Sequence, residues 1–383
     1  MSRRTSKKNR RKRRKSPFRI LILVVILITG VTVGIILLEK YRTYSDYRVE
    51  RVISMNNSEE NTEYYLFANG YLKCAGNGVA FFNERGVMWN EYYTMLRPVV
   101  DISANYAAVA DMAQQNVYLY DRSGFVNRIN LSHNITDVEI SDTGVVAIAS
   151  NDGSVNYIEI KDRNGNEIMT EKSIFSSRGF LMDLDLSADG SHLAAVFTSI
   201  DKGTLRSRLI FYDLSGDGSS SDIIAATYDQ YESVMLTTVR FMDSDTLCAV
   251  GDTAISIYDF AEVPELIYEE LDTAWEIQSL FFKPENVGMI VEEPDSETRY
   301  RIKVFDLAGN IQLDIGTDFS FNRADFAGNN VYLYSNNECL MYSLAGVEKM
   351  YLAFDKHIEA LKSYDGRHFV YGTNSDTEFI TVK

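Results

Sequence analysis

The chain has 383 residues, of which 45% are hydrophobic and 12% aromatic, and its net charge is −16. This hydrophobic share excludes wholesale disorder, and 24 Tyr and 20 Phe against 5 Pro favour strands over helices. The three cysteines, Cys74, Cys248 and Cys339, are widely spaced and odd in number, which excludes a disulfide framework and a thiolate zinc site.

The N-terminal residues differ sharply in charge from the rest of the chain. Residues 1–38 carry 11 Lys and Arg and no acidic residue, whereas 27 basic and all 54 acidic residues follow. We predict that residues 1–19 form a disordered basic tail in the cytoplasm, attracted to anionic lipid headgroups. A nucleic-acid partner is not expected, although an acidic cytoplasmic partner stays open.

The tail is followed by an uncharged apolar segment, Ile20–Leu38, whose length as a helix is about 28 Å, close to the thickness of a bilayer core. A cleaved signal peptide would have a shorter apolar core and a small-residue cleavage site. We therefore predict a transmembrane signal anchor at 20–38 with its N-terminus in the cytoplasm. A short stalk at 39–46 would then lead to an extracellular domain at 47–383, held at the plasma membrane.

From Tyr47 onward, strand-like segments form two alternating kinds of hairpin. The first kind has a turn such as the one in Ser141–Ser150, and the second has Asp or Asn at the start of the turn and Gly near its end, as in Tyr118–Gly124. Together they give four strands per unit, A to D, which is the pattern of a β-propeller blade. The predicted A–B hairpins are Tyr64–Gly76, Val99–Ala110, Ile135–Ser150, Leu181–Phe197, Leu236–Val250, Ile277–Val291, Phe321–Tyr334 and Ile358–Tyr371.

The two ends of this domain are predicted to meet in one blade. The last A–B hairpin is followed by a single strand, Thr377–Lys383, so strand D of that blade is missing. The N-terminal strand 47–55 would supply it by pairing with residues 377–383. This closure predicts an all-β propeller of eight four-stranded blades; seven is the alternative, if Tyr64–Gly76 belongs to an irregular closing blade.

The segment Leu186–Ala194 has the form ϕ-S-x-D-G-x-x-ϕ-A, through which the blades resemble WD40, TolB-like and quinoprotein-like propellers. The Gly-His and Trp-Asp signatures of WD40 repeats are missing, and the chain has only two tryptophans, Trp89 and Trp275. As a whole, the chain resembles an uncharacterised family of single-pass membrane-anchored propeller proteins of Gram-positive bacteria. This resemblance implies a fold and a location but no chemistry.

No catalytic signature is present, neither a nucleophile elbow nor a Walker loop, an H-E-x-x-H motif or a dinucleotide fingerprint. The four histidines fall in different predicted blades, so a metal site is not expected. Asp162–Glu167 and Asp217–Asp222 resemble Ca²⁺ loops but lack the full spacing of ligands, and ordinary turns are the favoured interpretation. We therefore expect a non-enzyme without cofactor or metal.

Binding is expected on the face that the D–A and B–C connections share. Tyr, Trp and Arg on loops of a rigid scaffold are typical of binding hot spots, although these side chains could also simply pack over the blade ends. The predicted contact residues are Tyr92, Tyr93, Arg97, Arg178, Tyr231 and Trp275. They lie in the predicted D–A connections Asn90–Pro98, Glu171–Gly179, Thr227–Met235 and Glu269–Glu276, beside the extended B–C loops Thr198–Ser207 and Glu292–Tyr300.

The function that these features favour is a non-catalytic extracellular propeller that binds a protein or a cell-envelope glycan through this face. Two alternatives remain: an extracellular hydrolase or lyase that acts on an envelope polymer, and an assembly subunit of a membrane complex. The identity of the partner and the oligomeric state are not encoded in any motif of the sequence.

Overall fold

The computed structural model describes residues 22, 24–32, 34, 41–55, 62–112, 114–216, 223–271, 276–292 and 297–383. The chain divides into two compact units, Met1–Thr43 and Tyr44–Lys383. Residues 24–32 of the first unit are helical, but no helix within the described ranges is long and apolar enough to cross a membrane. The tail predicted at 1–19 and part of the predicted anchor lie outside the described residues.

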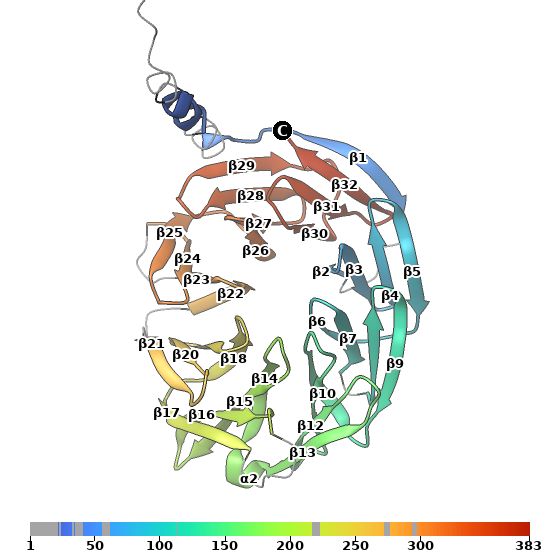
Figure 1. Cartoon of the computed structure of the whole chain (residues 1–383), viewed down its shortest axis with the longest axis vertical. Coiled ribbons are helices and arrows are strands. Elements are labelled where there is room, and N and C mark those ends of the chain that lie inside the picture. Colours follow the sequence, from blue (N-terminus) through green and yellow to red (C-terminus); the bar gives the residue numbers. More distant parts are fainter. Residues whose placement is uncertain are drawn as a thin grey trace, which may run out of the picture. The chain divides into compact units, whose positions relative to one another are not determined.

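In the described part of the second unit, 32 strands form eight four-stranded antiparallel sheets, arranged as a ring (Figure 1). This confirms the prediction of an all-β propeller with eight blades. Blades 1 to 4 are β2 (Glu63–Phe67), β3 (Gly70–Ala75), β4 (Gly78–Asn83) and β5 (Gly86–Tyr92); β6 (Pro98–Ile102), β7 (Tyr106–Asp111), β8 (Asn116–Asp121) and β9 (Gly124–Asn130); β10 (Asn134–Ile140), β11 (Val146–Asn151), β12 (Val155–Lys161) and β13 (Glu167–Ile174); and β14 (Phe180–Leu186), β15 (His192–Asp201), β16 (Thr204–Asp213) and β17 (Ile224–Glu232).

Blades 5 to 8 complete the ring, and the last blade contains both ends of the domain. They are β18 (Leu236–Phe241), β19 (Thr246–Gly251), β20 (Ala254–Asp259) and β21 (Glu265–Leu271); β22 (Glu276–Lys283), β23 (Asn286–Glu292), β24 (Tyr300–Asp306) and β25 (Ile311–Thr317); β26 (Arg323–Ala327), β27 (Asn330–Tyr334), β28 (Glu338–Ser343) and β29 (Glu348–Ala353); and β30 (Ala360–Ser363), β31 (His368–Gly372), β32 (Asp376–Val382) and β1 (Tyr47–Ser54).

The ring closes through β1, which pairs with β32 from Tyr47 opposite Val382 to Ser54 opposite Asp376. The chain enters the blade beside its own C-terminus, because the main-chain N–H of Lys383 donates to the carbonyl of Asp46 over 2.8 Å. This end of β1 lies at the face that carries the A–B and C–D turns, and the D–A and B–C connections lie at the opposite face.

Blades pack against each other through the middle strands, whose side chains are buried on both sides. Strand β11 is buried at Val146–Ser150, which explains a continuous apolar run where a half-exposed strand would alternate. One core cluster between blades 3 and 4 joins Ile160 with Phe197 and Tyr212. The Ser141 turn that recurs in the sequence is local geometry: its Oγ accepts the N–H of Val145 at 3.0 Å, and Gly144 has φ +85°.

Two of the predicted connections are wrong, because strands continue through them. The predicted loop Thr198–Ser207 is the end of β15 and the start of β16, joined by a tight turn at Lys202–Gly203. The predicted connection Thr227–Met235 is mostly β17. Polar side chains in both segments suggested loops, but they belong to long strands with one exposed side.

The turn at Asp162 is the ordinary type that the sequence favoured over a Ca²⁺ loop. Its carboxylate Oδ1 accepts the N–H groups of Asn164 and Asn166, at 2.9 and 2.8 Å. The second such segment, Asp217–Asp222, lies outside the described residues.

Candidate functional site

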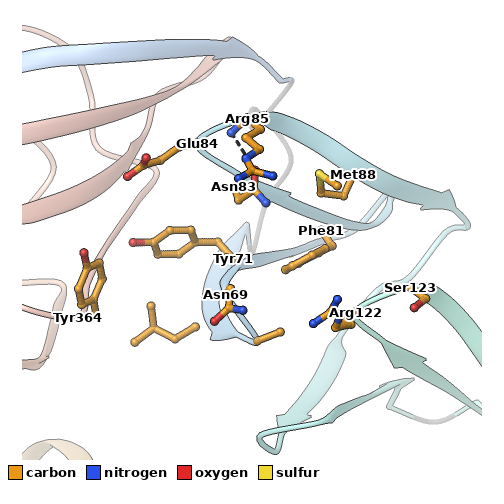
Figure 2. Close-up of a pocket in the computed structure, with 13 residues that line it drawn as sticks. Asn69, Tyr71, Phe81, Asn83, Glu84, Arg85, Met88, Arg122, Ser123 and Tyr364 are labelled. Carbon is orange, nitrogen blue, oxygen red and sulfur yellow. Dashed lines mark hydrogen bonds between the residues drawn. The ribbon is translucent and has the colours of Figure 1, made fainter.

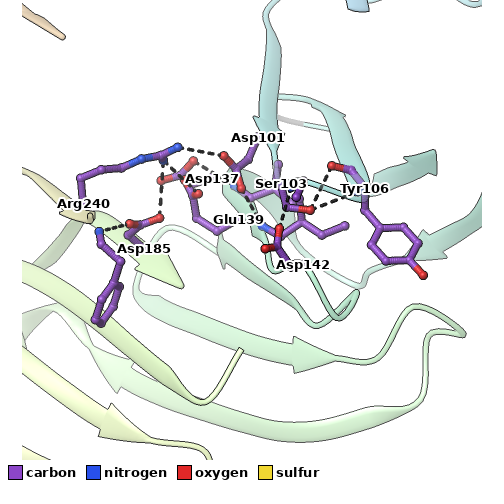
Figure 3. Close-up of polar contacts among 12 residues, drawn as sticks. Asp101, Ser103, Tyr106, Asp137, Glu139, Asp142, Asp185 and Arg240 are labelled. Atoms are coloured by element: carbon purple, nitrogen blue, oxygen red, sulfur yellow. Dashed lines mark hydrogen bonds and ion pairs between the residues drawn. The ribbon is translucent and has the colours of Figure 1, made fainter. Parts of the chain in front are cut away.

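The inner strands of blades 2 to 5 carry charged side chains that point toward one another (Figure 3). The guanidinium of Arg240 on β18 lies 3.2 Å from Asp101 on β6, 3.3 Å from Glu139 on β10 and 3.5 Å from Asp185 on β14. We call these four side chains, together with Asp137 on β10 and Asp183 on β14, the central cluster. It contains five carboxyl groups and one guanidinium.

The carboxylates of the central cluster also tie neighbouring blades together. Asp101 Oδ2 accepts the main-chain N–H of Ile140 in the next blade, at 2.8 Å. Asp183 Oδ2 accepts the N–H of Val239 at 2.8 Å, and Asp185 accepts the N–H of Phe241. Because these N–H groups would otherwise be unpaired at the inner edge of each sheet, the carboxylates stabilise the ring itself.

Two pairs of carboxyl groups in the central cluster interact directly with each other. Asp137 interacts with Asp183, and Glu139 interacts with Asp185. Burial is the largest cause that raises the pKa of Asp137 to about 6 and that of Asp185 to about 6, and it raises the pKa of Glu139 and Asp183 well above their usual range. Neighbouring carboxylates add to this effect, while Arg240 opposes it for Asp185 and Glu139.

A repeated irregularity of the inner strands accompanies this arrangement. The pairing of β10 with β11 slips by one residue between Ile135 and Asp137, and that of β14 with β15 slips between Leu181 and Asp183. Such a bulge re-aims the side chains that follow it. Sequence reasoning missed the cluster, although its signal is visible: Asp-x-Glu at 137–139 and Asp-x-Asp at 183–185 stand at the same place in consecutive A strands.

The oxygens of the central cluster are mostly occupied by contacts within the ring. The side chains of Asp101, Glu139 and Asp185 are only 5–10% exposed, and their oxygens are occupied by N–H groups and by Arg240. Glycoside hydrolysis needs two carboxyl groups roughly 5–9.5 Å apart, with sugar or water between them, whereas the carboxyl groups of each pair here interact with each other. Within the described ranges, no group of His, Cys, Asp or Glu is arranged to hold a metal ion.

The other half of the centre contains a small cavity of about 260 Å³ between blades 1, 6, 7 and 8. Ion pairs cross it: Arg323 contacts Glu63, and Lys362 contacts Asp325. The second pair links the inner strands of the neighbouring blades 7 and 8, and the first joins blade 7 to blade 1 across blade 8, so charge pairs of opposite sign hold this half of the centre.

Three of the six predicted contact residues are placed together near blade 1. Tyr92 at the end of β5 is 79% exposed, and Arg97 is also exposed. Tyr93 is half-buried: its ring stacks on Tyr118 with centroids 4.7 Å apart, and its hydroxyl accepts a hydrogen bond from Tyr120. Tyr92 and Arg97 are therefore available to a partner, while Tyr93 packs over the blade end.

Of the other three predicted contact residues, Arg178 and Tyr231 are described, and their side chains are engaged within the protein. Arg178 forms an ion pair with Glu171 and lies over the ring of Phe197. Tyr231 is 2% exposed, with its hydroxyl bonded to that of Tyr258, so its prediction as a contact residue is wrong. A slip in the pairing of β16 with β17 turns Tyr231 into the core, which simple alternation does not anticipate. Trp275 lies outside the described residues.

The D–A/B–C face instead presents an aliphatic and aromatic surface that sequence reasoning did not single out. We call it the hairpin patch; it consists of Ile174, Phe180, Met182 and Ile200, which are 55%, 58%, 41% and 76% exposed. It surrounds a short helix, α2 (Phe175–Arg178), which lies where blades 3 and 4 meet (Figure 1). The rings of Phe175 and Phe180 are 4.5 Å apart.

The hairpin patch depends on the unusual length of β15 and β16. Each has ten residues, so the hairpin continues past Phe180, which pairs with Thr198, and carries Ile200 beyond it. Gly179 fits against this extension, since a Cβ there would lie 2.3 Å from the carbonyl oxygen of Thr198. The patch is thus built from regular elements and not from a mobile loop.

Comparison with known proteins identifies the family. Residues 40–382 match the model of a family described as "Family of unknown function (DUF5711)". The chain belongs to this family. No curated protein matches it.

Solved structures resemble this member of the family in fold. BamB from Moraxella catarrhalis is 12% identical with a TM-score of 0.54, and the match covers 87% of this chain and 97% of that one. Sqt1 from Chaetomium thermophilum is 10% identical with a TM-score of 0.57, covering 88% and 100%. At these identities the likeness concerns the propeller fold alone.

Proposed function

We propose that the protein is a non-catalytic propeller that binds another protein through the hairpin patch. The observation that carries this proposal is the grouping of Ile174, Phe180, Met182 and Ile200, all more than 40% exposed, on one face of the ring. Clustered exposed apolar side chains mark interaction sites. Three of the four side chains are unbranched or aliphatic and carry no hydrogen-bonding group, which suits a protein partner better than a glycan.

The setting of the hairpin patch supports the same proposal. Charged side chains border it, including the Arg178–Glu171 pair and the contacts of Arg206 with Asp201 and Glu232. An apolar centre with a polar rim is the usual anatomy of a protein interface. Tyr92 and Arg97, exposed on the same face near blade 1, would extend the contact area for a large partner.

The location that we propose rests on the amino-acid sequence. The apolar run Ile20–Leu38 and the basic residues before it favour a signal anchor with the propeller outside the plasma membrane.

Site-specific photo-crosslinking in intact cells tests this function. A photoreactive residue replaces Ile200 in the full-length chain, and a matched one replaces Ile311 on the outer strand β25, which is 53% exposed. We expect a discrete protein adduct from position 200 and none from 311. The change Phe180→Asp should abolish the adduct without lowering the melting temperature. Equal adducts at both positions, no adduct at 200, or an adduct that survives Phe180→Asp would reject the hairpin patch.

A further inference from the structure

A cavity of about 900 Å³ opens on the A–B/C–D face, opposite the hairpin patch; Figure 2 shows the residues that line it. Turns of three neighbouring blades surround it: Ala68–Asn69 and Glu84–Arg85 of blade 1, Arg122–Ser123 of blade 2, and Tyr364 of blade 8. Tyr71 and Phe81 provide aromatic walls. Its volume is that of a ligand site. We call it the blade 1 pocket.

The A–B turn of blade 1 differs from those of the blades that follow it. In blades 2 to 4 these turns are joined: the N–H of Ala104 donates to Asp142 at 2.6 Å, and the N–H of Asp142 donates to the carbonyl of Ala188 at 2.7 Å. The blade 1 turn has only two residues, Ala68 and Asn69, between β2 and β3, and no hydrogen bond joins it to a described neighbouring turn.

The equivalent turn of blade 3 shows which side chain can occupy this position beside an arginine. Asp121 and Asp162 begin the C–D turns of blades 2 and 3, and each is followed by an arginine, Arg122 and Arg163. Arg163 reaches back to blade 2, where its Nη1 donates to the hydroxyl of Tyr106 and its guanidinium lies 5.9 Å from the centre of that ring. The arginine in the C–D turn of blade 3 is thus in contact with a tyrosine ring of the preceding blade.

At the corresponding place before Arg122 the tyrosine is missing. Tyr106 begins strand B of blade 2 and pairs with Asp121; the residue that begins strand B of blade 1, opposite Asn83, is Gly70. A Cβ on Gly70 would lie 2.5 Å from the carbonyl oxygen of Phe82, so this position admits no side chain without movement. The space that a tyrosine ring fills in front of Arg163 is therefore open in front of Arg122.

Both arginines of the pocket are held by the main chain with their guanidinium groups unpaired. The carbonyl of Arg122 accepts the indole N–H of Trp89 at 3.2 Å, and that of Arg85 accepts Nη2 of Arg51 at 2.8 Å. Neither guanidinium has a hydrogen-bond or ion-pair partner among the described residues. With Glu84 as the acidic residue of the lining, the pocket carries one more basic than acidic side chain, in a chain of net charge −16.

We propose that the blade 1 pocket binds a tyrosine side chain, flanked by acidic residues, of a partner polypeptide. The tyrosine ring would lie against Arg122, as Tyr106 lies against Arg163, and a neighbouring carboxylate would pair with Arg85. The aromatic lining of Tyr71 and Phe81 suits a ring, and the excess positive charge suits its acidic flanks. This site is on the opposite face from the hairpin patch and does not depend on the proposed function.

A peptide selection on the full-length chain tests the proposal. The probes are acetylated, amidated pentapeptides with tyrosine at the centre and randomised flanks. We expect Asp and Glu to be enriched beside the tyrosine, and the best peptide to lose its binding when tyrosine is replaced by alanine. Arg122→Gln should weaken its affinity at least tenfold, and Arg85→Gln should reduce the preference for acidic flanks.

The matched control is Arg163→Gln, which removes the same charge from the equivalent turn, where the arginine already has its tyrosine. It should leave peptide affinity within about twofold, and the melting curves of all three variants should show that they fold. Failure to enrich any peptide, enrichment without acidic flanks, or equal losses from Arg122→Gln and Arg163→Gln would overturn the proposal. Variants of the hairpin patch, such as Phe180→Asp, should not alter peptide binding, so the two sites are judged separately.

Discussion

At the scale of single residues, the most informative groups are the buried carboxyls of the central cluster, whose pKa values are raised. Asp183 interacts with Asp137 and accepts the N–H of Val239. An asparagine can make both contacts, because its amide donates and its carbonyl accepts. Asp183→Asn therefore keeps the geometry while removing a group that must lose its proton as the pH rises.

We predict that Asp183→Asn makes the stability of the propeller less dependent on pH. The folded-state pKa values of these carboxyls are raised, so the folded state holds more protons than the unfolded state between pH 4 and 7, and unfolding free energy falls as the pH rises through about 6. Denaturant titrations should show a gain of roughly 1–3 kcal/mol for the variant at pH 7.5 and little change at pH 4. The exposed Asp229→Asn serves as the control; an equal gain there, or a loss at pH 7.5, would contradict the assignment.

At the scale of strands and turns, the extended β15–β16 hairpin and α2 depend on a glycine at their contact. Gly179 has φ +99° and ψ −168°, a region that is essentially restricted to glycine, and a Cβ would meet the carbonyl of Thr198. Gly203, in the tip of the same hairpin, has φ +88° but open space around it. A side chain at Gly203 would meet only the backbone strain of a positive φ, whereas one at Gly179 would also clash with Thr198.

We predict that Gly179→Ala destabilises the propeller more than Gly203→Ala. The second change should cost about 1–2 kcal/mol, the usual penalty of a left-handed conformation for alanine, and the first should cost more, because Thr198 must also move. Thermal or denaturant unfolding measures both, and adduct formation at Ile200 reports whether the hairpin patch is preserved. Equal costs would show that the contact with Thr198 is easily relaxed.

The sequence predicted strands better than it predicted their ends and their inward faces. Repeated turn chemistry located all eight A–B hairpins, because Gly and Asp have specific roles in turns. The alternation of inward and outward side chains gave wrong directions where the pairing of two strands shifts by one residue. Tyr231 turns inward beside such a shift, and Asp137 and Asp183 directly follow one. The hairpin patch was missed for another reason: Ile174 and Ile200 stand in segments that were predicted to be connections, and only Tyr, Trp and Arg were considered there as contact residues.

At the scale of the whole molecule, stability of the ring depends on a strand from the other end of the domain. Strand β1 has mostly exposed side chains, so its contribution comes from its seven paired positions with β32 and from Tyr44 and Tyr47, which pack at its start. Tyr47 lies against Phe354 with ring centroids 5.0 Å apart. Without β1, strand β32 becomes an exposed edge, which favours aggregation.

We predict that removing residues 1–55 opens the ring, whereas removing residues 1–43 does not. The larger deletion should lower the free energy of unfolding by on the order of 4 kcal/mol, since each hydrogen bond lost contributes about 0.5–1.5 kcal/mol. A synthetic peptide of residues 44–55 should restore the melting temperature in proportion to the logarithm of its concentration, because it binds only the folded ring. A peptide of the same composition in scrambled order should have no effect. If both deletions melted alike, or if the scrambled peptide restored stability equally, closure by β1 would contribute little to the fold.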